Sequence, residues 1–200
     1  MDKDFGDNSD SLSESKVLIE QSMHVVFPLL KNNSPVVVFF NPARIDVVLD
    51  AVRSAGFIFR RMMWMYKPND VCFPFRGWLL TSEAILLFSK GELSLPKPTQ
   101  YDHDCYIYNH GRKDTSFWHP SVKSLDVTQR LVGQITQHDD IVLDPFLGSG
   151  TTAVACVRTG RHFIGIEKNH EYCEIAKMRV RNEMSNSNNK KHSLKEIYQQ

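Results

Sequence analysis

The chain has 200 residues, of which 42% are hydrophobic and 24% charged, and its formal net charge is +1. These values are ordinary for one globular domain with a sizeable core, and so small a net charge indicates no particular partner. No apolar run approaches the roughly 18 residues of a membrane helix, and the acidic N-terminus lacks the positive and apolar regions of a signal peptide. The four cysteines are scattered without CxxC spacing, so we expect reduced thiols in a cytoplasmic protein.

The first half of the chain alternates helical and extended patterns. Apolar positions at helical spacing predict a helix over 13–30, and an apolar run predicts a strand over 36–40. A proline at its start and a glycine at its end bound a second predicted helix over 42–56. Residues 57–66 and 84–88 are each expected to form a strand.

Four basic residues of this half could form part of a local basic surface that binds nucleic acid. Such binding does not require a positive net charge of the whole chain. The alternative is that they are solvated charges at a helix end and a strand edge. They are Arg53, Arg60, Arg61 and Lys67.

Residues 91–117 lack apolar periodicity and predict a long connection, which is usually functional or mobile. Interleaved aromatic and basic side chains suit stacking on nucleobases or contact with phosphates; the alternative is a surface loop with its tyrosines folded inward. These side chains are Tyr101, Tyr106, Tyr108, Arg112 and Lys113. His103, Cys105 and His110 match no closed zinc ligand set, so no metal site is expected.

The second half predicts a regular alternation of helices and strands, typical of an α/β fold with a parallel sheet. The predicted elements are a helix over 125–137, a strand over 141–144, a helix over 151–159, a strand over 162–167 and a helix over 171–182. The polar residues 183–200 predict an irregular tail.

The most informative stretch follows the predicted strand 141–144. This strand ends in Asp144, and a turn containing Gly148 and Gly150 leads into the next helix. Glycines permit backbone angles closed to other residues and let a ligand approach, while the free amides of a helix start favour a carboxylate or phosphate. Glu167 ends the next strand, where an acid can accept both hydroxyls of a ribose. The unit therefore predicts half of a nucleotide-like cofactor site.

Three other interpretations of this turn were weighed. A phosphate-binding P-loop needs a lysine before the Ser/Thr, and none is present. A nicotinamide site favours a third glycine, whose place is taken by Ala153. A tight turn without a ligand would explain the glycines alone, but the acid at each strand end argues against it.

The stretch Asp144–Thr152, of sequence DPFLGSGTT, resembles the S-adenosylmethionine motif of amino-methylating DNA methyltransferases. In the β class of that family the cofactor half follows the catalytic half. Other stretches fit in the right order. They are Trp118–Lys123 before the cofactor strand, Ile166–Glu167 with Tyr172, Ala176 and Arg179 after it, and upstream Trp64–Asn69 and Glu83–Gly91.

The resemblance implies a Rossmann-like α/β methyltransferase sheet with helices on both faces, and S-adenosylmethionine as cofactor. It also implies methylation of an exocyclic amine of adenine or cytosine in DNA, without a metal or covalent intermediate. Asp144 and the amides of residues 148–152 would hold the amino-acid end of the cofactor, Glu167 the ribose, and His119 and Lys123 would close the site. The implied cofactor residues are His119, Lys123, Asp144, Pro145, Phe146, Gly148, Ser149, Gly150, Thr151, Thr152, Glu167 and Lys168.

One expected element is missing. The family carries an Asp-Pro-Pro-Tyr or Ser-Pro-Pro-Tyr tetrapeptide that holds the target amine and stacks on the base swung out of the duplex, and these 200 residues contain neither. No catalytic residue is therefore assigned. Residues 4–8 resemble the sequence just after that tetrapeptide, so the chain is expected to begin downstream of its catalytic loop. The central strand would then be absent, leaving unpaired edges on strands 36–40 and 141–144.

The predicted organisation is one domain over 1–182, with the remainder of the catalytic half in 11–90 and the cofactor half in 118–182. The chain is expected to be a fragment, a half that pairs with a second chain supplying the catalytic segment, or a decayed remnant. The alternative function is a catalytically empty module that binds cofactor or DNA. A third possibility is methylation of RNA or a small molecule on a similar scaffold.

Overall fold

The structure is a computed structural model, and it describes residues 9–68, 74–75, 78–79, 81–97, 101–108 and 122–197. The chain divides into two compact units, which are described separately. The first comprises residues 1–94 and 100–109, and the second residues 95–99 and 110–200. Among the described residues, no helix is both long and apolar enough to cross a membrane.

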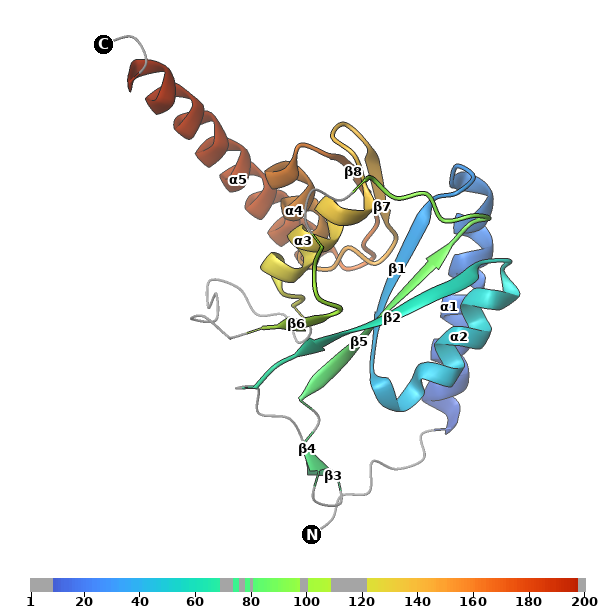
Figure 1. Cartoon of the computed structure of the whole chain (residues 1–200). Coiled ribbons are helices and arrows are strands. Elements are labelled where there is room, and N and C mark those ends of the chain that lie inside the picture. Colours follow the sequence, from blue (N-terminus) through green and yellow to red (C-terminus); the bar gives the residue numbers. More distant parts are fainter. Residues whose placement is uncertain are drawn as a thin grey trace. The chain divides into compact units, whose positions relative to one another are not determined.

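A four-stranded mixed sheet forms the centre of the first unit (Figure 1), with strand order β1-β5-β2-β6. Strand β5 (Ser82–Ser89) is antiparallel to β1 (Pro35–Phe40) and to β2 (Ile58–Tyr66). Its apolar residues 84–88 are all buried, and pairing on both sides makes it a central strand. A short hairpin of β3 (Pro74–Phe75) and β4 (Trp78–Leu79) forms a separate two-stranded sheet.

Two helices pack against each other in this unit: α1 (Ser9–Leu29) and α2 (Ile45–Ser54), which a 3-10 turn, Pro42–Arg44, precedes. Aromatic rings anchor them to the sheet region. Phe27 of α1 meets Phe57 edge to face at 4.9 Å between centroids. The guanidinium of Arg53, in α2, lies over the ring of Phe59 in β2. The apolar pattern of α2 is thus explained by one buried face, with Val48, Ala51 and Val52. Helix α1 buries Met23 and Val26 but leaves Val17, Leu18, Val25 and Leu29 exposed.

The expectation that 91–117 has no secondary structure is wrong for part of that segment. Strand β6 (Cys105–Ile107) pairs parallel with Trp64–Tyr66 of β2. Only Tyr106 of the three is buried, between exposed neighbours, so the strand is too short to show a period of two in the sequence. Its pairing partner, rather than its own sequence pattern, defines it.

The second unit begins with helix α3 (Leu125–Ile135) and continues β7 (Ile141–Asp144), α4 (Thr151–Thr159), β8 (His162–Gly165) and α5 (His170–Ile197). Strands β7 and β8 are parallel, as predicted. The helix predicted to end at 182 continues to Ile197, because no glycine or proline interrupts the chain there.

A small core holds this unit together. Val132 of α3 and Cys156 of α4 are buried against Val142 of β7 and Phe163 of β8. Alternate residues of the strands point to the other face, where Ile141 is 66% and Ile164 is 54% exposed. Within this unit β7 is therefore covered on one face only, because both α3 and α4 pack on the same side.

Several of the described strands lie at a sheet edge, and β1 and β7 are two of them. Among the described strands, β1 pairs only with β5, and β7 only with β8. The α/β class is confirmed, with helices and a mixed sheet in one unit and a parallel strand pair in the other.

Candidate cofactor site

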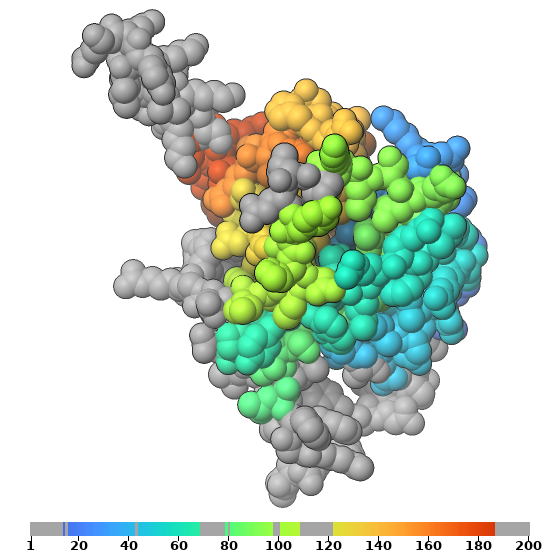
Figure 2. Space-filling model, in the orientation of Figure 1, coloured from blue at the N-terminus to red at the C-terminus, as the bar shows by residue number. Residues whose placement is uncertain are grey.

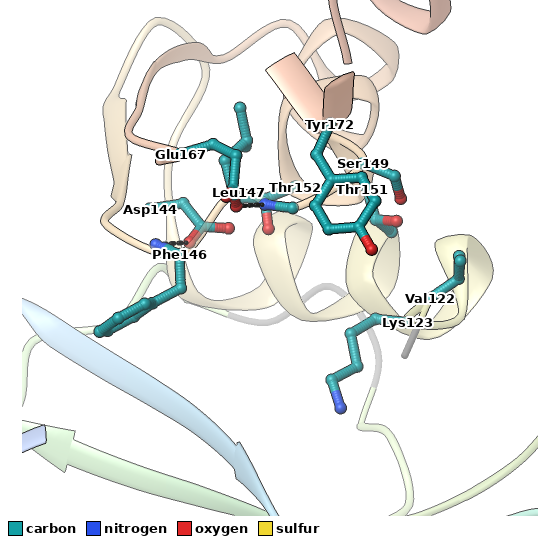
Figure 3. Close-up of a pocket in the computed structure, with 11 residues that line it drawn as sticks. Val122, Lys123, Asp144, Phe146, Leu147, Ser149, Thr151, Thr152, Glu167 and Tyr172 are labelled. Carbon is teal, nitrogen blue, oxygen red and sulfur yellow. Dashed lines mark hydrogen bonds between the residues drawn. The ribbon is translucent and has the colours of Figure 1, made fainter. Parts of the chain in front are cut away.

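A pocket of about 280 Å³ lies at the carboxyl ends of β7 and β8, where open α/β sheets commonly bind ligands (Figure 3). All of its lining residues belong to the second unit. They come from the segment before α3, the end of β7, the glycine turn, the first turn of α4, the end of β8 and the start of α5. They are Val122, Lys123, Asp144, Phe146, Leu147, Gly148, Ser149, Thr151, Thr152, Glu167 and Tyr172.

Asp144 ends β7 and organises the turn that follows. Its Oδ1 accepts a hydrogen bond from the amide of Phe146 at 2.9 Å, an aspartate turn that bends the chain away from the strand. The amide of Leu147 donates to the carbonyl of Ile166, which follows β8, at 2.9 Å. The turn is thereby attached to both strands before it reaches the glycines.

Glu167 connects the two halves of the pocket. Its Oε2 accepts from the amide of Gly148 at 2.9 Å (Figure 3). Its Oε1 accepts from the amide of Asn169 at 2.8 Å. Each carboxylate oxygen has a second lone pair. The side chain can therefore hold the glycine turn and still accept hydrogen bonds from two neighbouring hydroxyls of a ligand.

The start of α4 presents free backbone donors at the pocket. The first intrahelical bond runs from the amide of Val154 to the carbonyl of Gly150, so the amides of Thr151 and Thr152 lie at the unpaired end of the helix. Partial positive charge collects at such an end. The arrangement suits the carboxylate of an amino-acid group, as the sequence predicts.

The glycines of the turn have different roles. Gly148 has φ 54° and lines the pocket. Gly150 has φ 87° and does not line it. A Cβ on Gly150 would lie 2.7 Å from the Cβ of Ala176 in α5. Gly150 is thus required by the packing of α5 against the turn rather than by contact with a ligand.

Eight of the twelve predicted residues come together in the pocket, three described ones lie outside its lining, and one is not described. The eight are Lys123, Asp144, Phe146, Gly148, Ser149, Thr151, Thr152 and Glu167. Pro145, Gly150 and Lys168 are absent from the lining. His119 lies outside the described residues.

Three lining residues were not among the predicted cofactor residues: Val122, Leu147 and Tyr172. Tyr172 had a signal, since it belongs to the pattern of the helix after Glu167 that carries part of the resemblance. Leu147 lies within the glycine motif, and its side chain occupies the position that a Cβ on Gly165 would take. Val122 carries no chemical signal in the sequence.

The proposed basic face has internal partners instead. Side chains of α2 and β2 form neighbouring parts of one surface (blue to cyan in Figure 2). Arg60 donates to the hydroxyl of Ser89 at 2.8 Å, and Arg61 pairs with Asp104 at 3.0 Å. Nζ of Lys67 lies 3.0 Å from Oε2 of Glu83, whose side chain is 11% exposed. Each of these cations, like Arg53 over its aromatic ring, thus has a partner within the first unit. The Arg61–Asp104 pair is largely exposed and contributes little to stability.

The tyrosines of the 91–117 segment differ in exposure, so that one fits the stacking interpretation and another the inward-folded one. Tyr106 is 2% exposed and folded inward, whereas Tyr101 is 92% exposed. Arg112, Lys113 and His110 lie outside the described residues. Within the described part of the chain, no cluster of His, Cys, Asp or Glu has the arrangement of a metal site.

The parallel strand pair, the glycine turn and the carboxylate at each strand end define the class of protein: an α/β fold of the kind that binds nucleotide-like cofactors. The DNA methylase family model matches residues 1–178. The chain belongs to this family of S-adenosylmethionine-dependent enzymes, which methylate an exocyclic amine of adenine or cytosine in DNA.

Individual relatives agree with this assignment. The chain is 28% identical over 162 residues to the putative methylase YubD of Escherichia coli K12, covering 81% of this chain and 68% of the relative. It is 29% identical over 198 residues to the Type II methyltransferase M2.DpnII of Streptococcus pneumoniae, and the match covers 90% of this chain and 72% of the relative. The crystal structure of the M1.HpyAVI–SAM complex superposes with a TM-score of 0.70 at 27% identity, covering 80% of this chain and 81% of that one.

Proposed function

We propose that the pocket at the ends of β7 and β8 is the S-adenosylmethionine site of this DNA methylase. One observation carries the proposal: Asp144, Glu167 and the free end of α4 line a single pocket. In this arrangement the amides of Thr151 and Thr152 hold the cofactor's carboxylate. Glu167 accepts the ribose hydroxyls, and Lys123 and Tyr172 bound the opposite side.

The bound cofactor supplies an activated methyl group on a sulfonium. The residues of the pocket bind and orient it, and none of them is assigned to proton transfer. Holding the methyl donor and the amine in line lowers the entropic cost of transfer. Because these residues position the cofactor only, methyl transfer also needs a group that holds the target amine.

We propose that this group lies on a segment beyond the described residues, either of the same polypeptide or of a second chain. The sequence contains no Asp-Pro-Pro-Tyr or Ser-Pro-Pro-Tyr. The exposed face of the β7–β8 pair, which bears Ile141 and Ile164, supports the proposal. It is a surface that a further segment with apolar side chains would cover. The cited relatives come from bacteria, where DNA lies in the cytoplasm, and we propose the same location here.

Calorimetric titration with S-adenosylmethionine, together with transfer of a tritiated methyl group to mixed-sequence DNA, tests the function. The matched controls are the chain alone and the chain with an N-terminal extension containing the tetrapeptide. We expect binding in both and transfer with the extension. Binding without transfer in either would favour a catalytically empty module, and transfer to RNA but not DNA would change the substrate. Absence of cofactor binding would reject the site.

A further inference from the structure

We propose that Arg179, which does not line the pocket, is a positioning residue of the cofactor site: it holds the glycine turn in its binding conformation. This inference rests on the function proposed above. The residue lies in α5, and its side chain contacts the turn at Ser149 and Thr151.

The contacts of Arg179 converge on the two residues that flank Gly150. Its Nη1 donates to the carbonyl oxygen of Ser149 at 2.6 Å and lies 3.1 Å from the hydroxyl of the same residue. The hydroxyl of Thr151 lies 3.4 Å from the same nitrogen. Ser149 and Thr151 are only 3% and 6% exposed. Hydrogen bonds from a charged donor to buried acceptors are among the stronger ones in proteins.

These contacts fix the orientation of one peptide plane. The carbonyl of Ser149 and the amide of Gly150 belong to the same peptide group, which is planar. On one side that carbonyl accepts from Arg179, and on the other the amide of Gly150 donates to Leu147 at 3.0 Å. With both ends bonded, the peptide cannot rotate without breaking two hydrogen bonds. The left-handed Gly150 and the start of α4 are held in register with the pocket.

Helix α5 reinforces the same point with a second residue. Ala176 and Arg179 are three positions apart and share a face of the helix. Ala176 lies against Gly150, leaving no space for a Cβ there. Ala176 thus holds the turn by close packing, and Arg179 holds it by hydrogen bonds. A glycine-rich turn without such support would sample several conformations and lose affinity.

A second arginine offers a matched control. Arg158 of α4 donates to Oε2 of Glu183 in α5 at 2.9 Å, so it also joins α4 to α5. Neither Arg158 nor Glu183 contributes to the pocket lining. If Arg179 acted only by joining the two helices, loss of Arg158 would have a similar effect on cofactor binding.

The test compares the full chain with its Arg179→Ala, Arg179→Lys and Arg158→Ala variants by calorimetric titration with S-adenosylmethionine. We expect Arg179→Ala to raise the dissociation constant by about 10- to 100-fold and Arg158→Ala to leave it nearly unchanged. Lysine keeps the charge and can replace one donor, so Arg179→Lys should fall between. Equal dissociation constants for the wild type and both Arg179 variants would overturn the inference.

Amide hydrogen exchange without cofactor gives a second, independent readout. We expect the amides of residues 148–152 to exchange faster in Arg179→Ala than in the wild type and in Arg158→Ala. Unchanged exchange there would also overturn the inference. Wild-type protein that does not bind S-adenosylmethionine would instead reject the proposed function, whatever the exchange shows. Should Arg179→Ala fail to fold, the lysine variant carries both measurements.

Discussion

The amide of Gly148 donates a hydrogen bond to Oε2 of Glu167 at 2.9 Å, so the acid after β8 fixes the glycine turn after β7. Each oxygen of this carboxylate keeps a lone pair after its backbone bond. In the proposed cofactor site, the same side chain would therefore fix the turn and accept the ribose hydroxyls. Its removal is expected to affect both the turn and the cofactor.

Glu167→Ala should weaken S-adenosylmethionine binding by about 1.5–3 kcal/mol, the range for hydrogen bonds to a charged group. Glu167→Gln is the informative control, because its amide oxygen can keep one backbone bond while the charge is lost. We expect an intermediate affinity, measured by calorimetry. Wild-type affinity in the alanine variant would contradict the role given to this carboxylate.

Gly150→Ala should lower the free energy of unfolding by about 2–4 kcal/mol, because a left-handed backbone and a clash with Ala176 are both costly. The matched control is Gly133→Ala in α3, where a Cβ meets no atom within 4 Å. That change should stabilise the helix by about 0.5–1 kcal/mol. Denaturant unfolding of the two variants would therefore show opposite signs, and a neutral Gly150→Ala would place α5 elsewhere.

Ser124→Ala should destabilise the protein by about 0.5–2 kcal/mol through loss of a helix cap. Ser124 is 2% exposed, and its hydroxyl accepts from the amide of Val127 at the start of α3. Ser124→Thr keeps the hydroxyl and should retain most of the stability. Thermal unfolding in which the alanine and threonine variants behave alike would show that the cap contributes nothing.

Cys156 should resist alkylation at pH 8 while Cys105 reacts. Burial, with a smaller contribution from the negative charge of Asp144, raises the pKa of the Cys156 thiol from 9.0 to about 11. Cys105 is exposed. Peptide mapping after brief treatment with iodoacetamide distinguishes the two sites, and early labelling of Cys156 would mean that α4 opens readily.

The same shift has a consequence for stability at alkaline pH. The folded protein holds the Cys156 proton more tightly than the unfolded chain, so the thiol stabilises the fold below about pH 9. This contribution should decline as the pH rises from 9 towards 11. The loss of unfolding temperature between pH 8 and 10 should accordingly be smaller in Cys156→Ala than in the wild type.

Local chemistry made much of the site predictable. The acid that ends β7, the glycines, the start of α4 and Gly160 as its C-terminal cap all follow from short-range patterns, and the structure has each of them. The left-handed φ of 70° at Gly160 is what a helix-ending glycine requires.

Features that depend on distant partners were not predictable in the same way. Strand β6 exists because it pairs with β2, and the role of Gly150 depends on Ala176, 26 positions along the sequence. The basic residues of β2 looked available because their partners, Ser89 and Asp104, are far away in the chain. Sequence spacing indicates which side chains are suited to a task, but only tertiary contacts show which are already engaged.

The open side of β1 affects how the protein can be handled. Pro35–Phe40 is a run of three valines and two phenylalanines after the proline, and among the described strands it pairs with β5 alone. Exposed edge strands of this composition associate with one another at high concentration. The purified protein should therefore aggregate as it is concentrated. A short peptide that pairs with the edge of β1 should reduce this aggregation.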